Sequence, residues 1–387
     1  MSEWKTYRLG DLCSRIKSGK GIPASEVSTT GEYPVIGGNG IRGYTNTSNF
    51  NGVCAVVGRQ GAYCGNVRFF SGEAYMTEHA VVIVGNELAD TRYLAYLLSI
   101  MQLGHLSAQP GLSVQTLSKL SINIPDISTQ RRIVGILGSL DDKIELNRRI
   151  NANLEAQAQA LFRSWFVDFE PFRDGPFVDS ELGKIPASLK IEHIGNIPHK
   201  IESGKRPKGG ASEHGIPSIG AENIKGLGIY DYAKTKFIPE DFASTMKKGK
   251  INGYELLIYK DGGKPGYFIP NFTIFGEGFP YKEMYINEHV FCLDFFDKGF
   301  NTFAYFYMRT PYIMNQLNTI GGKAAIPGIN TKDIESLPIF TNENEKVKEF
   351  GTLFLPTIKT ILQNCVENKT LSALRDTLLP KLIAGEI

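Results

Sequence analysis

Signals for membrane insertion and secretion are absent from this sequence of 387 residues. No apolar run approaches the roughly 20 residues that a helix needs to cross a bilayer. The opening residues, MSEWKTYRLGD, lack the basic and then apolar order of a secretory signal. We therefore expect a cytoplasmic chain that does not bind membranes.

Sequence motifs for metal binding and for disulfide frameworks are also absent. None of the five cysteines belongs to a C-x-x-C pair or stands at ligand spacing from a histidine, as zinc sites and disulfide frameworks require. We expect no metal site, and we expect these thiols to be reduced and buried. The five are Cys13, Cys54, Cys64, Cys292 and Cys365.

Motifs of nucleotide and methyl-transfer chemistry are missing as well. The sequence contains neither a G-x-x-x-x-G-K-[ST] phosphate loop nor the Asn/Asp-Pro-Pro-aromatic tetrapeptide of methylases. Residues 38–43 spell G-x-G-x-x-G, but no acidic residue stands near position 63 to bind a ribose, and no clear βαβ unit surrounds them. Glycines in turns are the better interpretation. We predict a chain without catalytic apparatus and without a cofactor of its own.

Charge of one sign is not in excess. The formal net charge is +2, and 42% hydrophobic with 21% charged residues is ordinary for a globular protein. This balance excludes a strongly basic, histone-like binder. It leaves open nucleic-acid binding through local patches, because clustering on one face is what matters. The length allows two or three domains.

The stretch between residues 130 and 169 has a heptad pattern. A helix of about 37 residues is roughly 55 Å long, which exceeds the need of a compact domain, so we expect it to span a distance. A helix lying on the surface of its own domain is the alternative. Apolar or seam-forming residues recur in alternating steps of three and four: Leu137, Leu140, Ile144, Asn147, Asn151, Leu154, Ala158, Leu161 and Trp165.

The same pattern returns at the end of the chain. Steps of three and four predict a second long helix there, with Pro356 as an interruption that we expect to form a kink or a first turn. The seam residues are Val347, Phe350, Phe354, Thr357, Ile361, Asn364, Asn368, Leu371, Arg375, Leu378 and Leu382.

The order I-x-x-N-x-x-x-N-x-x-L stands in both helices, 217 residues apart. If the helices pair antiparallel, Asn147 faces Asn368 and Asn151 faces Asn364. An Asn amide opposite an apolar residue would lose its hydrogen bonds, so these four residues would set the register of the pair. A position on a solvated flank is the alternative interpretation.

The segments outside the helices repeat as well. Residues 16–20, IKSGK, return as residues 201–205, IESGK, and residues 75–79, YMTEH, return as residues 285–289, YINEH. The offset between the copies changes only in loops. Short β-branched runs between Gly- and Asn-rich clusters indicate mixed α+β domains. The chain therefore reads as a tandem duplication, in which each half is one globular domain followed by one long helix.

Three segments resemble a known family: SLDDKIELNRRINANLEAQAQALFRSWFVDFEP, SELGKIP and LSALRDTLLPKLIAGEI. They are similar to the specificity subunit of Type I restriction-modification systems, and the resemblance extends over the whole chain. It implies two target-recognition domains that each read one half of a bipartite DNA site. It also implies that the two helices act as a ruler and dock two modification subunits. S-adenosylmethionine, ATP and Mg²⁺ would belong to those adenine-methylating subunits and to a separate restriction subunit.

With that resemblance, the expected fold is α+β, with two tandem-repeated target-recognition domains separated by two long antiparallel coiled-coil helices under a pseudo-two-fold axis. A long helix follows each domain, and a linker joins the first helix to the second domain. The expected parts are domain 1 at 1–128, a central spacer helix at 129–169, a linker at 170–188, domain 2 at 189–340 and a C-terminal spacer helix at 341–387.

Base reading draws on Arg, Lys, Asn and Gln in loops, and phosphate binding draws on Lys, Arg and backbone N–H groups. The repeated Ser-Gly-Lys loop is assigned mainly to phosphate, with an ordinary solvated turn as the alternative. A second repeated loop reads Arg-Gln-Gly in the first half and Lys-Asp-Gly in the second. The DNA-binding candidates are Lys17, Lys20, Asn39, Arg42, Arg59, Gln60, Lys205, Arg206, Lys208, Lys225, Lys260, Asp261, Lys264 and Lys323.

Two further possibilities remain open at this level. The repeated pairs Glu78-His79 and Glu288-His289 invite an acid–base interpretation, but their recurrence favours a hydrogen bond that orients a loop. For the whole chain, the alternatives are a coiled-coil assembly adaptor without DNA contact, or the recognition subunit of a Type II-like methyltransferase-nuclease.

Overall fold

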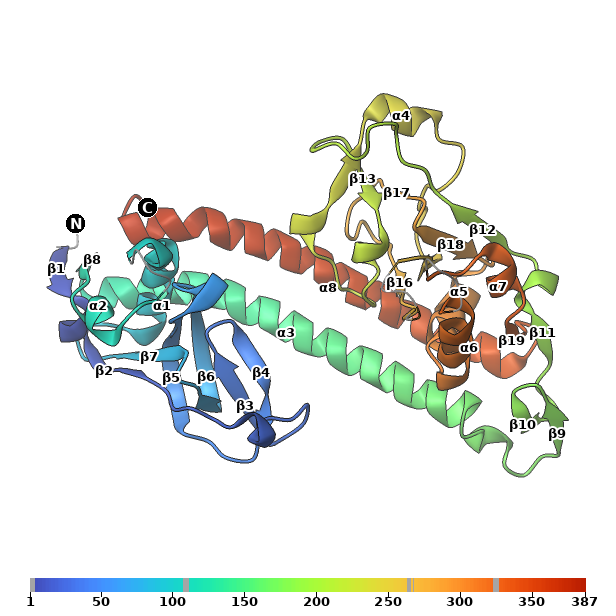
Figure 1. Ribbon diagram of the computed structural model, residues 1–387, viewed down its shortest axis with the longest axis horizontal. Coiled ribbons are helices and arrows are strands. Elements are labelled where there is room, and N and C mark those ends of the chain that lie inside the picture. The colour runs from blue at the N-terminus through green and yellow to red at the C-terminus, as the bar shows by residue number, and fades with distance from the viewer. Residues whose placement is uncertain (1–3, 107–110, 263–265, 267, 323–326) are drawn as a thin grey trace. The chain divides into compact units, whose positions relative to one another are not determined.

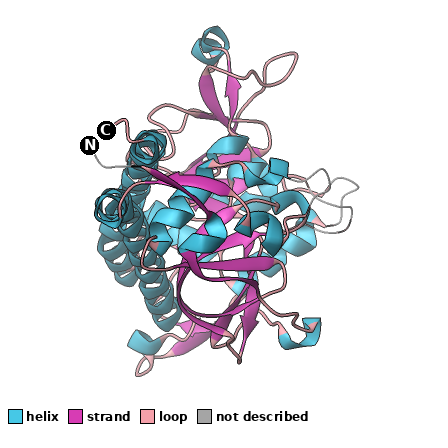
Figure 2. Ribbon diagram, turned by 90° about the vertical axis from the view of Figure 1, so that its left-hand side faces the viewer, coloured by secondary structure: helices cyan, strands magenta, loops and turns pink. Residues whose placement is uncertain are grey.

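The computed structural model describes residues 4–106, 111–262, 266, 268–322 and 327–387. The chain divides into two compact units: unit 1 comprises Met1–Lys143 and Leu371–Ile387, and unit 2 comprises Ile144–Thr370. Each unit contains both helices and strands, which agrees with the predicted α+β class. Figure 2 colours the helices and strands of the chain.

Unit 1 is built around one six-stranded sheet with the order β2-β7-β5-β6-β3-β4, and β1 pairs separately with β8. Neighbouring strands are antiparallel except β3 and β6, which run parallel at Val35–Tyr75 and Ile36–Met76. Figure 1 labels these strands. They are β1 (Lys5–Arg8), β2 (Cys13–Ser18), β3 (Tyr33–Gly37), β4 (Gly40–Thr45), β5 (Phe50–Gly58), β6 (Val67–Met76), β7 (Ala80–Gly85) and β8 (Ser121–Ile124).

Two short helices of unit 1, α1 (Thr91–Ile100) and α2 (Val114–Ser118), follow the sheet. Asp90 caps α1, because its carboxylate accepts hydrogen bonds from the N–H groups of Arg92 and Tyr93. The core of the unit joins buried side chains of β5, β7 and α1 to the start of one long helix and the end of the other. Burial of these apolar faces fixes both helix segments to the unit.

The described residues of unit 2 form four small sheets, with the orders β12-β18-β15-β16, β14-β13-β17, β11-β19 and β10-β9. The first three match the pairings of β2-β7-β5-β6, β4-β3-β6 and β1-β8 in unit 1, including one parallel pair, β13 with β17. The strands are β9 (Phe177–Ser180), β10 (Gly183–Pro186), β11 (Ile191–His193), β12 (Lys200–Ser203), β13 (Ile216–Ile219), β14 (Lys236–Ile238), β15 (Leu256–Tyr259), β16 (Phe272–Ile274), β17 (Tyr285–Ile286), β18 (Val290–Asp294) and β19 (Pro338–Phe340).

The core of unit 2 is rich in aromatic rings. The Phe162 ring centroid lies 5.6 Å from that of Phe303 and 5.4 Å from that of Phe350, so α5 and both long helices meet there. Such pairs contribute about 0.5–1.5 kcal/mol each beyond the area they bury. The short helices are α4 (Glu240–Thr245), α5 (Lys298–Met308), α6 (Pro311–Gly321) and α7 (Thr331–Glu335).

Short 3-10 helices occupy several turns of the two units. The turns after β1 and β11 both contain one, at corresponding positions of the repeated sequence. They are η1 (Leu9–Leu12), η2 (Ala24–Glu26), η3 (Gly61–Tyr63), η4 (Leu103–Leu106), η5 (Glu170–Phe172), η6 (Ile194–Asn196), η7 (Ala221–Asn223) and η8 (Tyr232–Lys234).

The two long helices are α3 (Ile127–Phe166) and α8 (Glu345–Ala384), of 40 residues each. Both predicted helices exist, with ends that differ by two to four residues from those expected. Helix α3 stops before the expected end, because the Asp168 N–H bonds to Arg163 O at 2.8 Å and Phe169 takes a left-handed conformation with φ of 52°. Gly385, with φ of 71°, follows α8.

Pro356 lies in the interior of α8, so the expectation of a first-turn position is wrong. The helix continues through it although proline lacks the N–H of the backbone hydrogen bond. Buried side chains on either side, Phe354 and Ile358, anchor the helix to the core of unit 2. The Thr360 hydroxyl donates to the Pro356 carbonyl at 3.0 Å. Tertiary packing therefore outweighs the local cost of the proline.

The segment predicted as a linker, residues 170–188, contains secondary structure. Strands β9 and β10 pair antiparallel, with Phe177 opposite Pro186 and Ser180 opposite Gly183. Ile185, only 3% exposed, packs into the core of unit 2. The Pro and Gly residues of this stretch thus belong to a hairpin that is attached to the unit, because its apolar side chains find a core to bury in.

Candidate nucleic-acid interface

Four loops of unit 1 meet at one edge of its sheet. We call them loop A (residues 19–21), loop B (37–39), loop C (59–61) and loop D (77–79). Loop D is central: the Thr77 N–H donates to Ile36 O at 2.9 Å, and His79 O accepts from the Arg59 N–H at 3.0 Å. Loop A joins them through the Lys20 N–H, which donates to Met76 O at 2.9 Å.

The same four loops meet in unit 2, as loop A (204–206), loop B (220–222), loop C (260–262) and loop D (287–289). The Asn287 N–H donates to Ile219 O at 2.9 Å, the Lys260 N–H donates to His289 O at 3.0 Å, and the Gly204 N–H donates to Asn287 O at 3.1 Å. Within each unit, loop D therefore bonds to loop C and to the strand before loop B through corresponding backbone groups, whereas the hydrogen bond of loop A joins different groups in the two units.

The repeated glycine of loop A has a steric reason. A Cβ on Gly19 would overlap the carbonyl of Met76, and a Cβ on Gly204 would overlap the carbonyl of Ile286. Only glycine lets the loop come this close to the neighbouring strand. The residues that follow, Lys20 and Lys205, are exposed. The Ser-Gly-Lys motif thus places a lysine beside loop D in each unit.

Loop B of unit 1 places an asparagine and two arginines together. Asn39 and Arg42 are exposed, and Arg68 of β6 donates from Nη2 to Asn39 Oδ1 at 3.3 Å. Arg68 was not among the residues that sequence reasoning selected. No local signal marks it, because it reaches Asn39 only through the pairing of strands that are distant in the sequence.

Loop C differs between the units. In unit 1, Arg59 is half-buried and Gln60 is exposed. In unit 2, Lys260 donates from Nζ to Glu288 O at 3.1 Å, and Asp261 contacts His289 Nδ1 through Oδ1. The two candidates of unit 2 are thus engaged within their own chain. From the sequence, Lys260 and Asp261 look like exposed residues at the tip of a loop. In the structure, both side chains contact loop D and so hold loops C and D together.

The glutamate–histidine pair of loop D recurs with partly different partners. His79 Nε2 lies 3.2 Å from Glu78 Oε1, and His289 Nε2 lies 3.3 Å from Glu288 Oε1. In unit 2, Arg206 Nε also lies 3.3 Å from Glu288 Oε1. The pair orients a loop in both units, and in unit 2 it additionally holds an arginine.

The remaining DNA-binding candidates lie around these loops or beyond the described residues. Lys17 is an exposed residue of β2, and Lys208 and Lys225 are exposed residues that follow loops A and B of unit 2. Lys264 and Lys323 lie outside the described residues.

The four seam asparagines lie in unit 2, where α3 and α8 run alongside each other. Asn147 donates from Nδ2 to Asn368 Oδ1 at 2.9 Å, and Asn364 donates from Nδ2 to Asn151 Oδ1 at 2.8 Å. Asn147 also donates to Glu367 Oε2 at 2.6 Å. The contacts join early residues of one segment to late residues of the other, so the two segments are antiparallel here.

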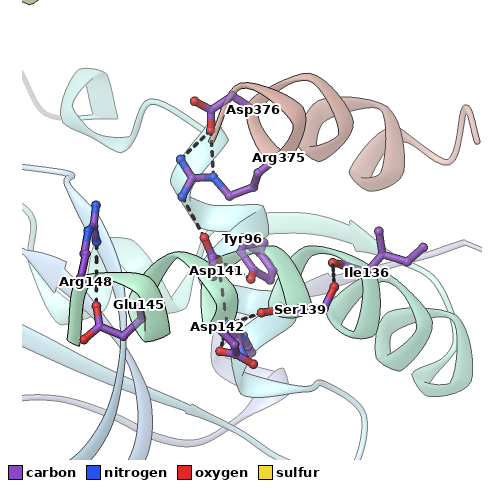
Figure 3. A network of polar contacts seen from close by, with 11 residues as sticks. Tyr96, Ile136, Ser139, Asp141, Asp142, Glu145, Arg148, Arg375 and Asp376 are labelled. Carbon is purple, nitrogen blue, oxygen red and sulfur yellow. Dashed lines mark hydrogen bonds and ion pairs between the residues drawn. The ribbon is translucent and has the colours of Figure 1, made fainter. Parts of the chain in front are cut away.

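In unit 1, an ion-pair network joins α3 to α8 and to α1 (Figure 3). Asp141 accepts from Arg375 Nη1 at 2.8 Å and from the Tyr96 hydroxyl at 2.6 Å. Arg92 Nη2 lies 2.8 Å from Asp142 Oδ1. Burial, together with the hydrogen bond to Asp141, raises the pKa of Tyr96. Tyr96 is therefore a neutral donor, and the network ties α1 to both long helices within unit 1.

No group of three metal-ligating side chains occurs in the part of the chain that the structure describes. The same residues include no helix with the length and apolar character to cross a bilayer. All five cysteines are free. Burial raises the pKa of the Cys13 and Cys54 thiols to about 12 and that of Cys365 to about 11, which keeps these thiols protonated and unreactive near neutral pH.

Comparison with known proteins identifies relatives of this arrangement. A family model for the Type I restriction modification DNA specificity domain matches residues 1–156. The chain is 28% identical over 341 residues to the Type I restriction enzyme HindI specificity subunit of Haemophilus influenzae, covering 72% of this chain and 71% of that protein. It is 28% identical over 288 residues to the MjaIX specificity subunit of Methanocaldococcus jannaschii, covering 73% and 64%.

A solved structure has a similar fold. The crystal structure of the Type I restriction-modification system S subunit from M. genitalium aligns over 98% of this chain and 96% of its own, with a TM-score of 0.61 and 17% identity. At that identity the likeness concerns the fold. Taken together, the comparisons show that residues 1–156 match the Type I restriction modification DNA specificity domain, and that the chain is similar to the specificity subunits of Type I restriction-modification systems.

Proposed function

We propose that this chain is the non-catalytic subunit that recognises a split DNA target for such a system. Unit 1 reads one half-site and unit 2 reads the other. The observation that carries the proposal is the repetition of loops A to D on matching strands with different side chains at their tips. A retained scaffold with altered loop residues is what two readers of unlike sequences need.

Within each unit the loop residues divide into two roles. Lys20 and Lys205 bind phosphate, because they follow a glycine that brings the backbone close and are themselves exposed. Asn39, Arg42 and Arg59 read base edges in the first half-site, since their side chains offer the forked donors and acceptors that bases match. Phosphate contacts set affinity and its salt dependence, while base contacts set the sequence.

The paired helices act as a spacer of fixed register. The hydrogen bonds of Asn147 with Asn368 and of Asn151 with Asn364 support this role, because sliding one helix by a turn would leave these amides facing apolar neighbours. The target therefore consists of two short, unlike sequences with a gap of constant length. We expect half-sites centred about one duplex turn apart, near 34 Å.

The helices also serve as the docking surface for two modification subunits, and through them for the restriction subunits. Large apolar side chains that are exposed on α3 and α8 support this part of the proposal, because a partner that covers them removes apolar surface from water and so stabilises the complex. S-adenosylmethionine, ATP and Mg²⁺ are used by those partners. The apolar residues are Ile136, Leu146 and Ile150 on α3, with Leu353 and Leu374 on α8.

The test is the sequence protected by the assembled complex. The complex is purified through a tag on this chain and incubated with a pool of randomised duplexes, and the bound duplexes are sequenced. A gapped motif with two unlike halves is expected. A motif without a gap, or binding with no sequence preference, would refute the proposal, and the latter result would favour an assembly adaptor that does not touch DNA.

A further inference from the structure

Gly21 and Arg206 occupy the same place in the two units. Both are the third residue of loop A, directly after the repeated Ser-Gly-Lys. Arg206 Nε lies 3.3 Å from Glu288 Oε1, and a Cβ built on Gly21 would lie 4.0 Å from Glu78 Oε2. The third position of loop A therefore faces the glutamate of loop D in each unit, although only unit 2 has a side chain there.

Arg206 is held through one end of its guanidinium group. Glu288 Oε1 lies 3.3 Å from Arg206 Nε and 3.3 Å from His289 Nε2, and His289 Nδ1 contacts Asp261. Among the residues that the structure describes, no hydrogen-bond acceptor contacts the two terminal nitrogens of Arg206, and the side chain is 32% exposed. In unit 1, Gln60 stands in place of Asp261, so the carboxylate that contacts the histidine of loop D in unit 2 is replaced by an amide.

This arrangement suits the reading of a guanine. An arginine presents two parallel N–H donors to guanine O6 and N7, which is the commonest specific contact in the major groove. A carboxylate at Nε orients the planar fork before DNA arrives, so less side-chain entropy is lost on binding. Phosphate binding would not need this orientation, because a phosphate accepts hydrogen bonds from many directions.

We propose that the third position of loop A determines specificity in both units, and that Arg206 reads a guanine in the second half-site. The proposal rests on the proposed function and names one residue and one base within it. Glu288 and His289 act as positioning residues through Arg206. Unit 1, with Gly21, lacks the corresponding guanine contact.

The experiment uses the complex purified through this chain and a pool of randomised 30-base-pair duplexes, as above. Arg206→Ala and Arg206→Lys should both lower the preference for guanine at one position of one half-site by roughly 10- to 100-fold, with all other positions unchanged. Lysine keeps the charge but lacks the fork. Lys184→Ala removes an exposed positive charge from the β9–β10 hairpin and serves as the matched control, with no change expected.

A second variant tests the position by gain of function. Gly21 has room for a side chain and its φ lies outside the left-handed region, so Gly21→Arg should fold and pair with Glu78. It should introduce a guanine preference at one position of the other half-site. Circular dichroism melting of each variant verifies that the fold is retained.

The outcomes distinguish a failure of the proposed function from a failure of the role proposed for Arg206. If the wild-type complex enriches no motif, the proposed function fails and this proposal fails with it. If the wild type enriches a split motif that Arg206→Lys retains in full, or if Arg206→Ala weakens binding to all sequences alike, Arg206 is not a base reader although the proposed function stands. A gapped motif that Gly21→Arg leaves unchanged overturns the claim for the first unit.

Discussion

The asparagine pair Asn151 and Asn364 offers a quantitative test of how the helix register is held. Their amides share one hydrogen bond of 2.8 Å, and Asn151 donates to Ile361 O at 3.2 Å. Replacing Asn364 by Leu leaves the Asn151 oxygen facing an apolar group, and replacing Asn151 by Leu leaves the Asn364 amide without its acceptor. An unsatisfied group costs about 1–3 kcal/mol, and half-burial of both side chains puts each single variant near the lower end.

The double variant Asn151→Leu with Asn364→Leu should be no less stable than the wild type. It removes both polar groups together and extends the apolar seam, so the two single losses do not add. The expected coupling free energy is about 1–2 kcal/mol. Urea denaturation of the full chain measures it: with a slope of about 2 kcal/mol per molar, each single variant lowers the midpoint by roughly 0.5–1 M.

Asn153 provides the control, because it is an exposed asparagine on the same helix whose oxygen accepts a hydrogen bond from Gln157 one turn away. Asn153→Leu should change the unfolding free energy by no more than about 0.5 kcal/mol. Additive single effects, with a coupling below about 0.3 kcal/mol, would show that the pair does not act as a unit. The register would then depend on the apolar seam alone.

Two further predictions concern unit 1 and the thiols. Asp141→Ala should destabilise the chain by about 2 kcal/mol in urea denaturation, because the Tyr96 hydroxyl loses its acceptor and Arg375 keeps only its contact with Asp376. Asp142→Ala, which affects a largely exposed carboxylate, should cost about 0.5 kcal/mol or less, and equal losses would contradict this account. Burial raises the pKa of Cys54 and Cys13 to about 12, so iodoacetamide should alkylate both thiols slowly in the native chain at pH 8. The alkylation rate should rise by roughly tenfold per pH unit, because the thiolate population grows by that factor. Rapid labelling at pH 8 without denaturant would show that the two thiols are not buried.

Helices α3 and α8 could be predicted because their signal is local. Side chains three and four residues apart share one face of a helix, so a seam such as Ile144, Asn147 and Asn151 is visible in the chain itself. The repeated Ser-Gly-Lys and Glu-His motifs were visible for a related reason: each performs a steric or hydrogen-bonding task that returns with the scaffold. Gly19 and Gly204 illustrate this, since both sit against a backbone carbonyl.

The sites that proved harder to predict depend on strand pairing. Arg68 contacts Asn39, 29 residues away in the sequence, through the fold of the sheet, and Asp261 contacts His289 because β15 pairs with β18. The hairpin at residues 177–186 looked like a linker because its Pro and Gly residues are typical of both.

The sequence by itself therefore predicted the long helices, a tandem duplication and an asparagine seam, since periodicity and internal repetition are properties of the chain alone. Only the tertiary structure decided which loop residues share an edge of the sheet and which charges are already engaged. The physical reason is that a side chain's availability depends on its neighbours in space. Arg206, with one end of its guanidinium group against Glu288, shows the difference most clearly.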